Sequence, residues 1–215
     1  MIIFLKTVHP FLRKDGLFMR QYKTLAVFML FMTFAFFLDS FSEFFATCDN
    51  IRDKVLRLHI IAASDTDSDQ SVKLKIRDRI LKESDELFYT DKGILSAKEK
   101  ALGNLEKIEK LANDELLNNG LKPTAKAEFT NMFFDTRVYD NFTLPAGNYD
   151  AVRVIIGEGK GKNWWCVLYP ALCIPAASDG LDTLTDEEIK IIEAAPRYEV
   201  KFLLVELIEK FKSFC

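Results

Sequence analysis

The sequence predicts an α+β fold: a single domain with a mainly antiparallel sheet, preceded by an N-terminal export or anchor helix. Apolar residues recur at helical spacing over residues 71–118, and the period changes to two from residue 125. Helical spacing returns after Gly180. Because helices and strands are segregated in the order β-α-α-β-β-β-α-α, we expect the strands to pair mainly antiparallel.

The first 46 residues differ in composition from the rest of the chain and predict an export segment. They hold 11 of the 19 phenylalanines, and residues 25–38 are apolar except for Thr33. A positive region precedes this run, with Arg13, Lys14, Arg20 and Lys23. Positive charge stays on the cytoplasmic side of a membrane, so the chain after the run is expected to be carried outward.

Two fates of this segment remain open. Residues 25–38 form a run of 14 residues, which suits a signal peptide, whereas a spanning helix needs roughly 20. A retained anchor is also consistent, because no clean cleavage site precedes Cys48 and apolar residues resume at Phe41. A start at Met19 instead of Met1 would leave an ordinary signal peptide.

Residues 47–215 are expected to form the exported domain. Five of the 29 Lys and Arg residues and three of the 32 Asp and Glu residues lie before residue 47, which leaves the domain with a net charge of −5. This acidic balance argues against nucleic-acid binding. Cys166 and Cys173 lie close together, and in an exported protein such a pair predicts a disulfide. Cys48 and Cys215 have no obvious partner in the sequence.

The first half of the domain predicts one strand and two helices. Residues 54–64 are rich in aliphatic and β-branched residues and predict a strand. Its predicted buried face consists of Leu56, Leu58 and Ile60. Residues 71–88 and 94–118 have apolar residues at helical spacing and predict the two helices.

The second half predicts three strands and two helices. Strands are predicted over residues 125–134, 151–157 and 164–170, the last two as a hairpin closed by a glycine-rich loop. Thr185 and Glu188 predict a capping box at the start of a helix. The final helix is predicted to carry one shared apolar face: Val200, Leu204, Leu207, Phe211 and Phe214.

The stretch GEGKGKNWWCVLYPALC, residues 157–173, first suggests a phosphate-binding loop. A Walker loop has two glycines five positions apart, Ser or Thr after its lysine, and then a helix. Here Gly157 and Gly161 are four apart, Asn163 follows Lys162, and a strand comes next. The pattern therefore favours a hairpin loop whose glycines relieve backbone strain.

An acidic cluster after the first strand resembles a calcium site only in spacing. The cluster consists of Asp65, Asp67 and Asp69. An EF-hand loop needs Gly and Glu at the positions of Gln70 and Ile76. We therefore interpret the three carboxylates as a helix-capping cluster.

No catalytic set emerges from the sequence. His59 is the only histidine after the export segment, and no Gly-x-Ser-x-Gly motif supplies a nucleophile for it. The acidic residues lie mostly on predicted helix faces, so no carboxylate pair stands out. We therefore expect no enzymatic activity, no metal and no cofactor.

Two adjacent tryptophans are the best candidates for contact with a protein partner. Neighbouring residues of a strand point to opposite faces, so one of the two rings is expected to be exposed beside the lysines of the loop. Exposed aromatic residues often anchor protein interfaces. The candidate partner-binding residues are Lys160, Lys162, Trp164 and Trp165. Burial of both tryptophans in the core is the alternative.

Two long stretches resemble the stage II sporulation protein R family. They are LRLHIIAASDTDSDQSVKLKIRD, residues 56–78, and LPAGNYDAVRVIIGEGKGKNWWCVLYPALC, residues 144–173. Ala63 departs from the asparagine expected there. The resemblance covers about residues 55–173, and the C-terminal helices carry no matching motif.

The resemblance implies an exported signalling protein of endospore-forming bacteria. Such a protein is made in the forespore and enters the intermembrane space between forespore and mother cell. There it activates a membrane-embedded aspartic protease that processes the sigma-E precursor, as a ligand and not an enzyme. The cytoplasmic membrane is its other implied partner, through the N-terminal segment. An exported cell-wall-binding or hydrolase domain is the alternative.

Overall fold

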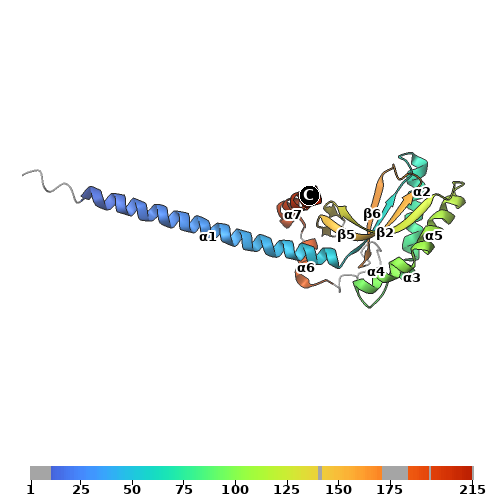
Figure 1. Cartoon of the computed structure of the whole chain (residues 1–215), viewed down its shortest axis with the longest axis horizontal. Helices are drawn as coiled ribbons and strands as arrows, with labels where there is room; N and C mark the ends of the chain where they lie inside the picture. Colours follow the sequence, from blue (N-terminus) through green and yellow to red (C-terminus); the bar gives the residue numbers. More distant parts are fainter. Residues whose placement is uncertain (1–10, 140–141, 171–183, 194, 215) are drawn as a thin grey trace, which may run out of the picture. The chain divides into compact units, whose positions relative to one another are not determined.

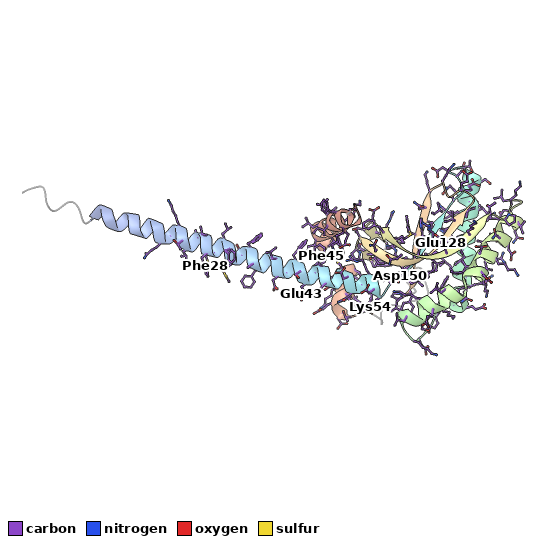
Figure 2. All side chains as sticks on the ribbon, viewed as in Figure 1. Phe28, Glu43, Phe45, Lys54, Glu128 and Asp150 are labelled. Carbon is purple, nitrogen blue, oxygen red and sulfur yellow. The ribbon has the colours of Figure 1, made fainter. Side chains whose placement is uncertain are left out.

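A computed structural model describes residues 11–139, 142–170, 184–193 and 195–214. Contacts between Cα atoms divide the chain into two compact units, Met1–Ala46 and Thr47–Cys215. Helix α1, Phe11–Asp53, begins in the first unit and ends in the second. By length and composition its part from Gln21 to Asp53 could cross a membrane. Phe28 and its apolar neighbours project outward from this helix (Figure 2).

The second unit contains a mixed sheet of four strands in the order β2-β5-β1-β6. The strands are β1 (Leu56–Ile61), β2 (Ala125–Phe134), β5 (Gly147–Ile156) and β6 (Asn163–Tyr169). Strand β2 pairs antiparallel with β5, and β6 pairs antiparallel with β1, whereas β1 and β5 run parallel. The predicted α+β class with a mainly antiparallel sheet is confirmed. A separate two-stranded ribbon is formed by β3 (Arg137–Val138) and β4 (Thr143–Leu144).

The predicted hairpin between the last two strands is wrong, because β1 lies between β5 and β6. The connecting residues 157–162 cross the end of β1 and bond to the chain that leaves it. Gly161 N donates to Ala62 O at 2.9 Å, and Lys160 N donates to Ala63 O at 3.3 Å. Strand β1 is buried on both faces at nearly every residue, which suits a central position better than an edge.

Helices cover one face of the sheet. They are α2 (Asp67–Lys82), α3 (Ser84–Leu87), α4 (Ile94–Gly103) and α5 (Leu105–Asn118). Figure 1 shows α2 and α5 side by side over the strands. Their apolar side chains meet Leu56, Leu58 and Ile60 of β1 in one core, as the strand pattern predicts. Lys98 of α4 also pairs at 2.8 Å with Asp150, which is labelled in Figure 2.

The helix boundaries differ from the predicted ones at both helices. The first begins at Asp67, because the Thr66 side chain caps it by accepting from Asp69 N at 3.3 Å. It ends at Lys82, and the short α3 follows. The second is divided at Asn104, whose Nδ2 donates to Leu87 O at 3.1 Å. Short polar side chains that bond to backbone groups favour such breaks.

The chain continues from Leu184 with two helices, α6 (Asp186–Glu193) and α7 (Ala195–Phe214). The predicted capping box is present, since Thr185 N donates to Glu188 Oε2 at 2.7 Å and Glu188 N to Thr185 Oγ1 at 3.3 Å. Helix α7 packs near the start of β5, on the other side of the sheet from α2 and α5 (Figure 1). Among its described side chains, Phe202, Val205 and Glu209 are buried.

The predicted apolar face of α7 is therefore not its buried face. Leu207 and Phe211 are 66% and 73% exposed, and Leu204 is half-buried. The side chains of Val200 and Phe214 lie outside the described residues. The sequence placed these residues correctly on one stripe, but α7 has a second apolar side, and packing selects that one.

Candidate partner-binding surface

The glycine-rich loop, residues 157–162, is held by its own backbone. Four of its amide groups donate to the protein besides Gly161: Gly157 N to Thr124 O, Gly159 N to Ile156 O, Lys160 N to Ala63 O, and Lys162 N to Asp65 Oδ1. A phosphate-binding loop must keep such amides available for the ligand. The donors here are already used, which agrees with the structural interpretation of the glycines.

The loop conformation requires glycine at several positions. Gly157 and Gly159 have φ values of +58° and +62°, in the left-handed region. At Gly161 a Cβ atom would lie 2.3 Å from Ser64 O. The buried Lys73 side chain adds a further bond, since its Nζ donates to Lys162 O at 3.0 Å. The loop thus presents its lysine side chains from a fixed backbone.

The two candidate lysines both point to solvent. Lys160 is 75% exposed and pairs with the equally exposed Glu158 at 2.5 Å. Lys162 is also exposed, while its backbone is bonded on both sides. An exposed pair of this kind contributes little to stability, so both cations remain accessible to an acidic partner.

Trp164 and Trp165 point to opposite faces of β6, as predicted, and both are half-buried. Trp164 packs against the helix-covered core and lies 5.1 Å from the Arg77 guanidinium carbon. Trp165 stacks on His59 with 3.7 Å between ring centroids and meets the edge of Phe134 at 4.8 Å. Both rings pack within the fold and keep some surface, so a contact of either ring with a partner stays a prediction.

The acidic cluster after β1 has structural tasks. Asp65 accepts from Lys162 N at 2.7 Å, which ties the loop to the start of α2. Asp69 accepts from Ser64 Oγ at 2.5 Å beside the Thr66 cap. Over the part of the chain that the structure describes, no group of three or more His, Cys, Asp or Glu side chains could hold a metal ion.

His59 is a buried, neutral histidine. Its Nε2 lies 2.9 Å from Asn163 Oδ1, and its ring is covered by Trp165. Its pKa is lowered from 6.5 to about 4, mainly by burial and also by the charges of Arg153 and Arg57, while the bond to Asn163 opposes the shift. A histidine that stays uncharged and covered suits a structural role.

Acidification should lower the stability of the protein because of this histidine. Since the folded pKa lies below the unfolded value of about 6.5, the unfolded chain takes up the proton first. Stability is complete above pH 6.5 and falls between pH 6.5 and 4, by up to about 3 kcal/mol from this group. Urea unfolding of the full chain in detergent at pH 7 and pH 5 measures this. In His59→Gln the difference between the two pH values should shrink; an unchanged difference would contradict the assignment.

Cys166 is fully buried in β6, and Cys173 lies outside the described residues. The disulfide between them therefore remains a prediction. Thiol titration of the exported, unfolded chain should find both residues blocked before reduction and reactive after it. If both react before reduction, packing alone holds this strand. Cys48 is a buried free thiol, and Cys215 is also outside the described residues.

One surface feature was missed by the sequence pattern. The side chains of Leu203, Leu207 and Phe211 are 62%, 66% and 73% exposed and follow one another at intervals of four residues. That spacing places them on one stripe of α7, which we call the α7 stripe. Contiguous exposed apolar side chains often mark a contact with another molecule. The signal available in the sequence was the apolar character of α7 on two sides, at Phe202 and Val205 as well as along the stripe.

An open cleft lies elsewhere, between α2 and α5. It has a volume of about 520 Å³, and its lining consists of Asp78, Arg79, Lys82, Glu83 and Glu115. Arg79 pairs across it with Glu115 at 3.5 Å. Neither tryptophan lines this cleft, so it does not have the arrangement of aromatic rings and carboxylates expected of a glycan-binding site.

These features define an α+β domain that follows an apolar N-terminal helix compatible with a signal peptide or a membrane anchor. Residues 52–179 match the family described as Stage II sporulation protein R. The chain belongs to this family, which confirms the resemblance and supports a role in sporulation. Helices α6 and α7 lie beyond the matched residues.

A curated relative gives the same result. The Stage II sporulation protein R of Bacillus subtilis (strain 168) is 35% identical to this chain over 153 residues. The match covers 71% of this chain and 67% of that protein. No solved structure matches the chain.

Proposed function

We propose that this chain is an exported signalling protein that acts between the forespore and the mother cell during endospore formation. In this proposal residues 1–46 export or anchor the chain, and residues 47–215 form the signalling domain in the intermembrane space. The domain activates a membrane-embedded aspartic protease, which then processes the sigma-E precursor. Membership of the sporulation family over residues 52–179 carries the proposal. The apolar helix of Gln21–Asp53 supports export.

We propose a ligand and not an enzyme. The residues that first suggest chemistry have structural tasks: His59 is buried under Trp165, Asp65 holds the loop, and the loop amides bond within the domain. The exposed lysines of the loop and the α7 stripe are two surfaces available for an encounter with another protein. This division of tasks favours recognition over catalysis.

Activation by a ligand requires a difference in affinity. The domain can shift the protease only if it binds the active state more tightly than the inactive one. Because an aspartic protease needs two aspartates brought together, a domain that favours the paired arrangement of the protease would activate it. The rigid loop is suited to this task, since its backbone bonds keep Lys160 and Lys162 in place.

Charge reversal at the loop tests this contact. The protein is co-expressed with the candidate protease and the sigma-E precursor in a non-sporulating host, and precursor cleavage is measured. The double change Lys160→Glu and Lys162→Glu should reduce cleavage at least about tenfold, since like charges across an interface disfavour docking. Leu207→Glu tests the α7 stripe in the same assay. Lys126 is an exposed lysine of β2, and Lys126→Glu is the matched control. With this variant the precursor should be cleaved normally.

The results separate the alternatives. Normal cleavage with the double loop variant and with Leu207→Glu would remove both surfaces from the proposal. The alternative function, binding or hydrolysis of the cell wall, predicts retention of the protein on purified peptidoglycan. A pull-down on peptidoglycan that retains the native chain and loses a Trp164→Ala variant would favour that alternative.

A further inference from the structure

Arg57 of β1 is a buried cation that has no acidic partner among the residues that the structure describes. It is 0% exposed, and it lies on the face of the sheet opposite the core of Leu56 and Leu58. Its guanidinium carbon lies 4.0 Å from the centroid of the Phe134 ring and 4.9 Å from that of Tyr149. Two aromatic rings thus enclose a charge that arginine retains at neutral pH.

Arg137 lies over the Trp165 ring, with 5.4 Å from its guanidinium carbon to the ring centroid. Four further arginines of the domain, Arg52, Arg77, Arg79 and Arg153, each pair with a carboxylate: Asp49, Asp78, Glu115 and Glu128. All four are more exposed than Arg57. Arg57 pairs with no carboxylate of the described residues, although a buried charge needs a partner more than an exposed one does.

Buried polar atoms without a partner gather at the same face of the sheet. Among the described residues five buried side-chain atoms have no hydrogen-bond partner, and three of them belong to Arg57 and His59. They are the donors Arg57 Nε and Arg57 Nη1 and, as an acceptor when Nε2 donates to Asn163 Oδ1, His59 Nδ1. Arg57 Nη2 alone is bonded, to the Tyr139 hydroxyl at 2.7 Å. Buried polar groups in folded proteins are almost always paired, so this concentration indicates a ligand contact.

Tyr139 is the group that a ligand would displace. It is half-buried, so its ring reaches from the guanidinium to the surface. It follows β3 and is held by one backbone bond, Tyr139 N to Phe142 O at 2.7 Å, and by stacking on Phe142 at 4.5 Å. Strands β3 and β4 have two residues each, and Val138 is 76% exposed. Such a ribbon opens at low cost compared with the four-stranded sheet.

We propose that Arg57 is a carboxylate-binding site that is reached when Tyr139 moves aside. The bound carboxylate accepts from the guanidinium between Phe134 and Tyr149 and supplies a negative charge that no described residue provides there. Charge-assisted bonds of this kind are the strongest that arginine forms. The carboxylate can belong to a small organic acid or to an acidic side chain of a partner protein. This inference stands apart from the proposed signalling role, because it concerns direct binding by this chain alone.

The test uses the full chain in detergent. It carries Trp164→Phe, so that Trp165 is the one tryptophan that remains. The Trp165 ring contacts Phe134, and the Arg57 guanidinium lies over the ring of Phe134. Sodium acetate should give a saturable change in fluorescence that sodium chloride at equal ionic strength does not give. A tetraglutamate peptide with blocked ends is compared with the matching tetraglutamine peptide. This comparison shows whether the bound carboxylate belongs to a small acid or to an acidic side chain of a partner. Binding of the peptide at least tenfold tighter than acetate assigns a partner's side chain, and equal affinity assigns a small acid.

Three variants decide the result. Arg57→Met should lose the saturable change, whereas Arg153→Met should keep it, because Arg153 is already paired with Glu128, labelled on β2 in Figure 2. Tyr139→Phe keeps Arg57 and removes the competing hydroxyl, so it should bind acetate roughly tenfold more tightly. If Arg57→Met does not fold, Tyr139→Phe decides alone. Absence of saturable binding, equal binding by Arg57→Met, or unchanged affinity in Tyr139→Phe would overturn the proposal.

Discussion

Replacing Gly161 with alanine is expected to lower the free energy of unfolding by about 3 kcal/mol or more. The new Cβ atom would lie 2.3 Å from Ser64 O and 2.6 Å from Ser64 C. Both are backbone atoms, so neither can rotate away as the end of a flexible side chain would. Relief requires the loop to move off the end of β1, which breaks the bonds from Gly161 N to Ala62 O and from Lys160 N to Ala63 O.

Gly103→Ala is the matched control for this change. Gly103 is the last residue of α4, and a Cβ atom there would meet nothing within 4 Å. Alanine favours a helix over glycine by roughly 1 kcal/mol, so this variant should be neutral or slightly more stable. Urea unfolding of the full chain in detergent compares the two. Equal midpoints for both variants would mean that the loop does not cross β1 as described.

Lys54→Met is expected to cost about 2 kcal/mol and to release the C-terminal helices from the domain. The Glu188 carboxylate is almost fully buried, and Lys54 Nζ, labelled in Figure 2, donates to both of its oxygens at 2.9 and 2.8 Å. Removal of one partner leaves a buried charge, a loss of about 3–5 kcal/mol in a dry site. The loss of stability expected here is smaller, because Lys54 is 34% exposed and water screens the pair.

Limited proteolysis and urea unfolding report this change together. Faster cleavage within α6 or α7 is expected, because the pair connects Lys54, between α1 and β1, to the first turn of α6. Lys160→Met is the control, since its pair with Glu158 is 75% exposed at both ends and should contribute almost nothing. If the two lysine variants unfold and are cleaved alike, the Lys54–Glu188 pair does not hold the helices.

Local features of this fold could be read from the sequence because neighbouring residues determine them. The alternation at Leu56, Leu58 and Ile60 defines one buried face whatever the strand pairs with. The capping box of Thr185 and Glu188 needs only a separation of three residues. Cap positions near Thr66 decide where α2 begins, which the apolar spacing alone does not show.

Strand order and the second face of the sheet depend on distant contacts. A short connection between two strands usually makes a hairpin, but here β1, about 100 residues earlier, occupies the place between them. The alternation in β1 showed that Arg57 and His59 lie opposite the apolar core. It did not show that Phe134, Tyr149 and Trp165 converge over them from three other strands.

The candidate surface was predicted in part. The lysines of the loop and the opposite directions of the two tryptophans follow from local sequence, and the structure agrees with both. The sequence predicted one apolar face on the last helix that included Leu207 and Phe211 but not Leu203. It did not show which of two apolar sides of α7 is buried, and Leu207 and Phe211 are exposed. The family was recognised from two long motifs, and residues 52–179 confirm it.

The central claim is that the domain signals from the outer side of the membrane. The direct measurement is cleavage of the sigma-E precursor in a non-sporulating host that carries the protease, with either the full chain or residues 47–215 retained in the cytoplasm at an equal level. We expect cleavage with the exported chain only. Equal cleavage with the cytoplasmic form, or no cleavage with the exported chain, would contradict it.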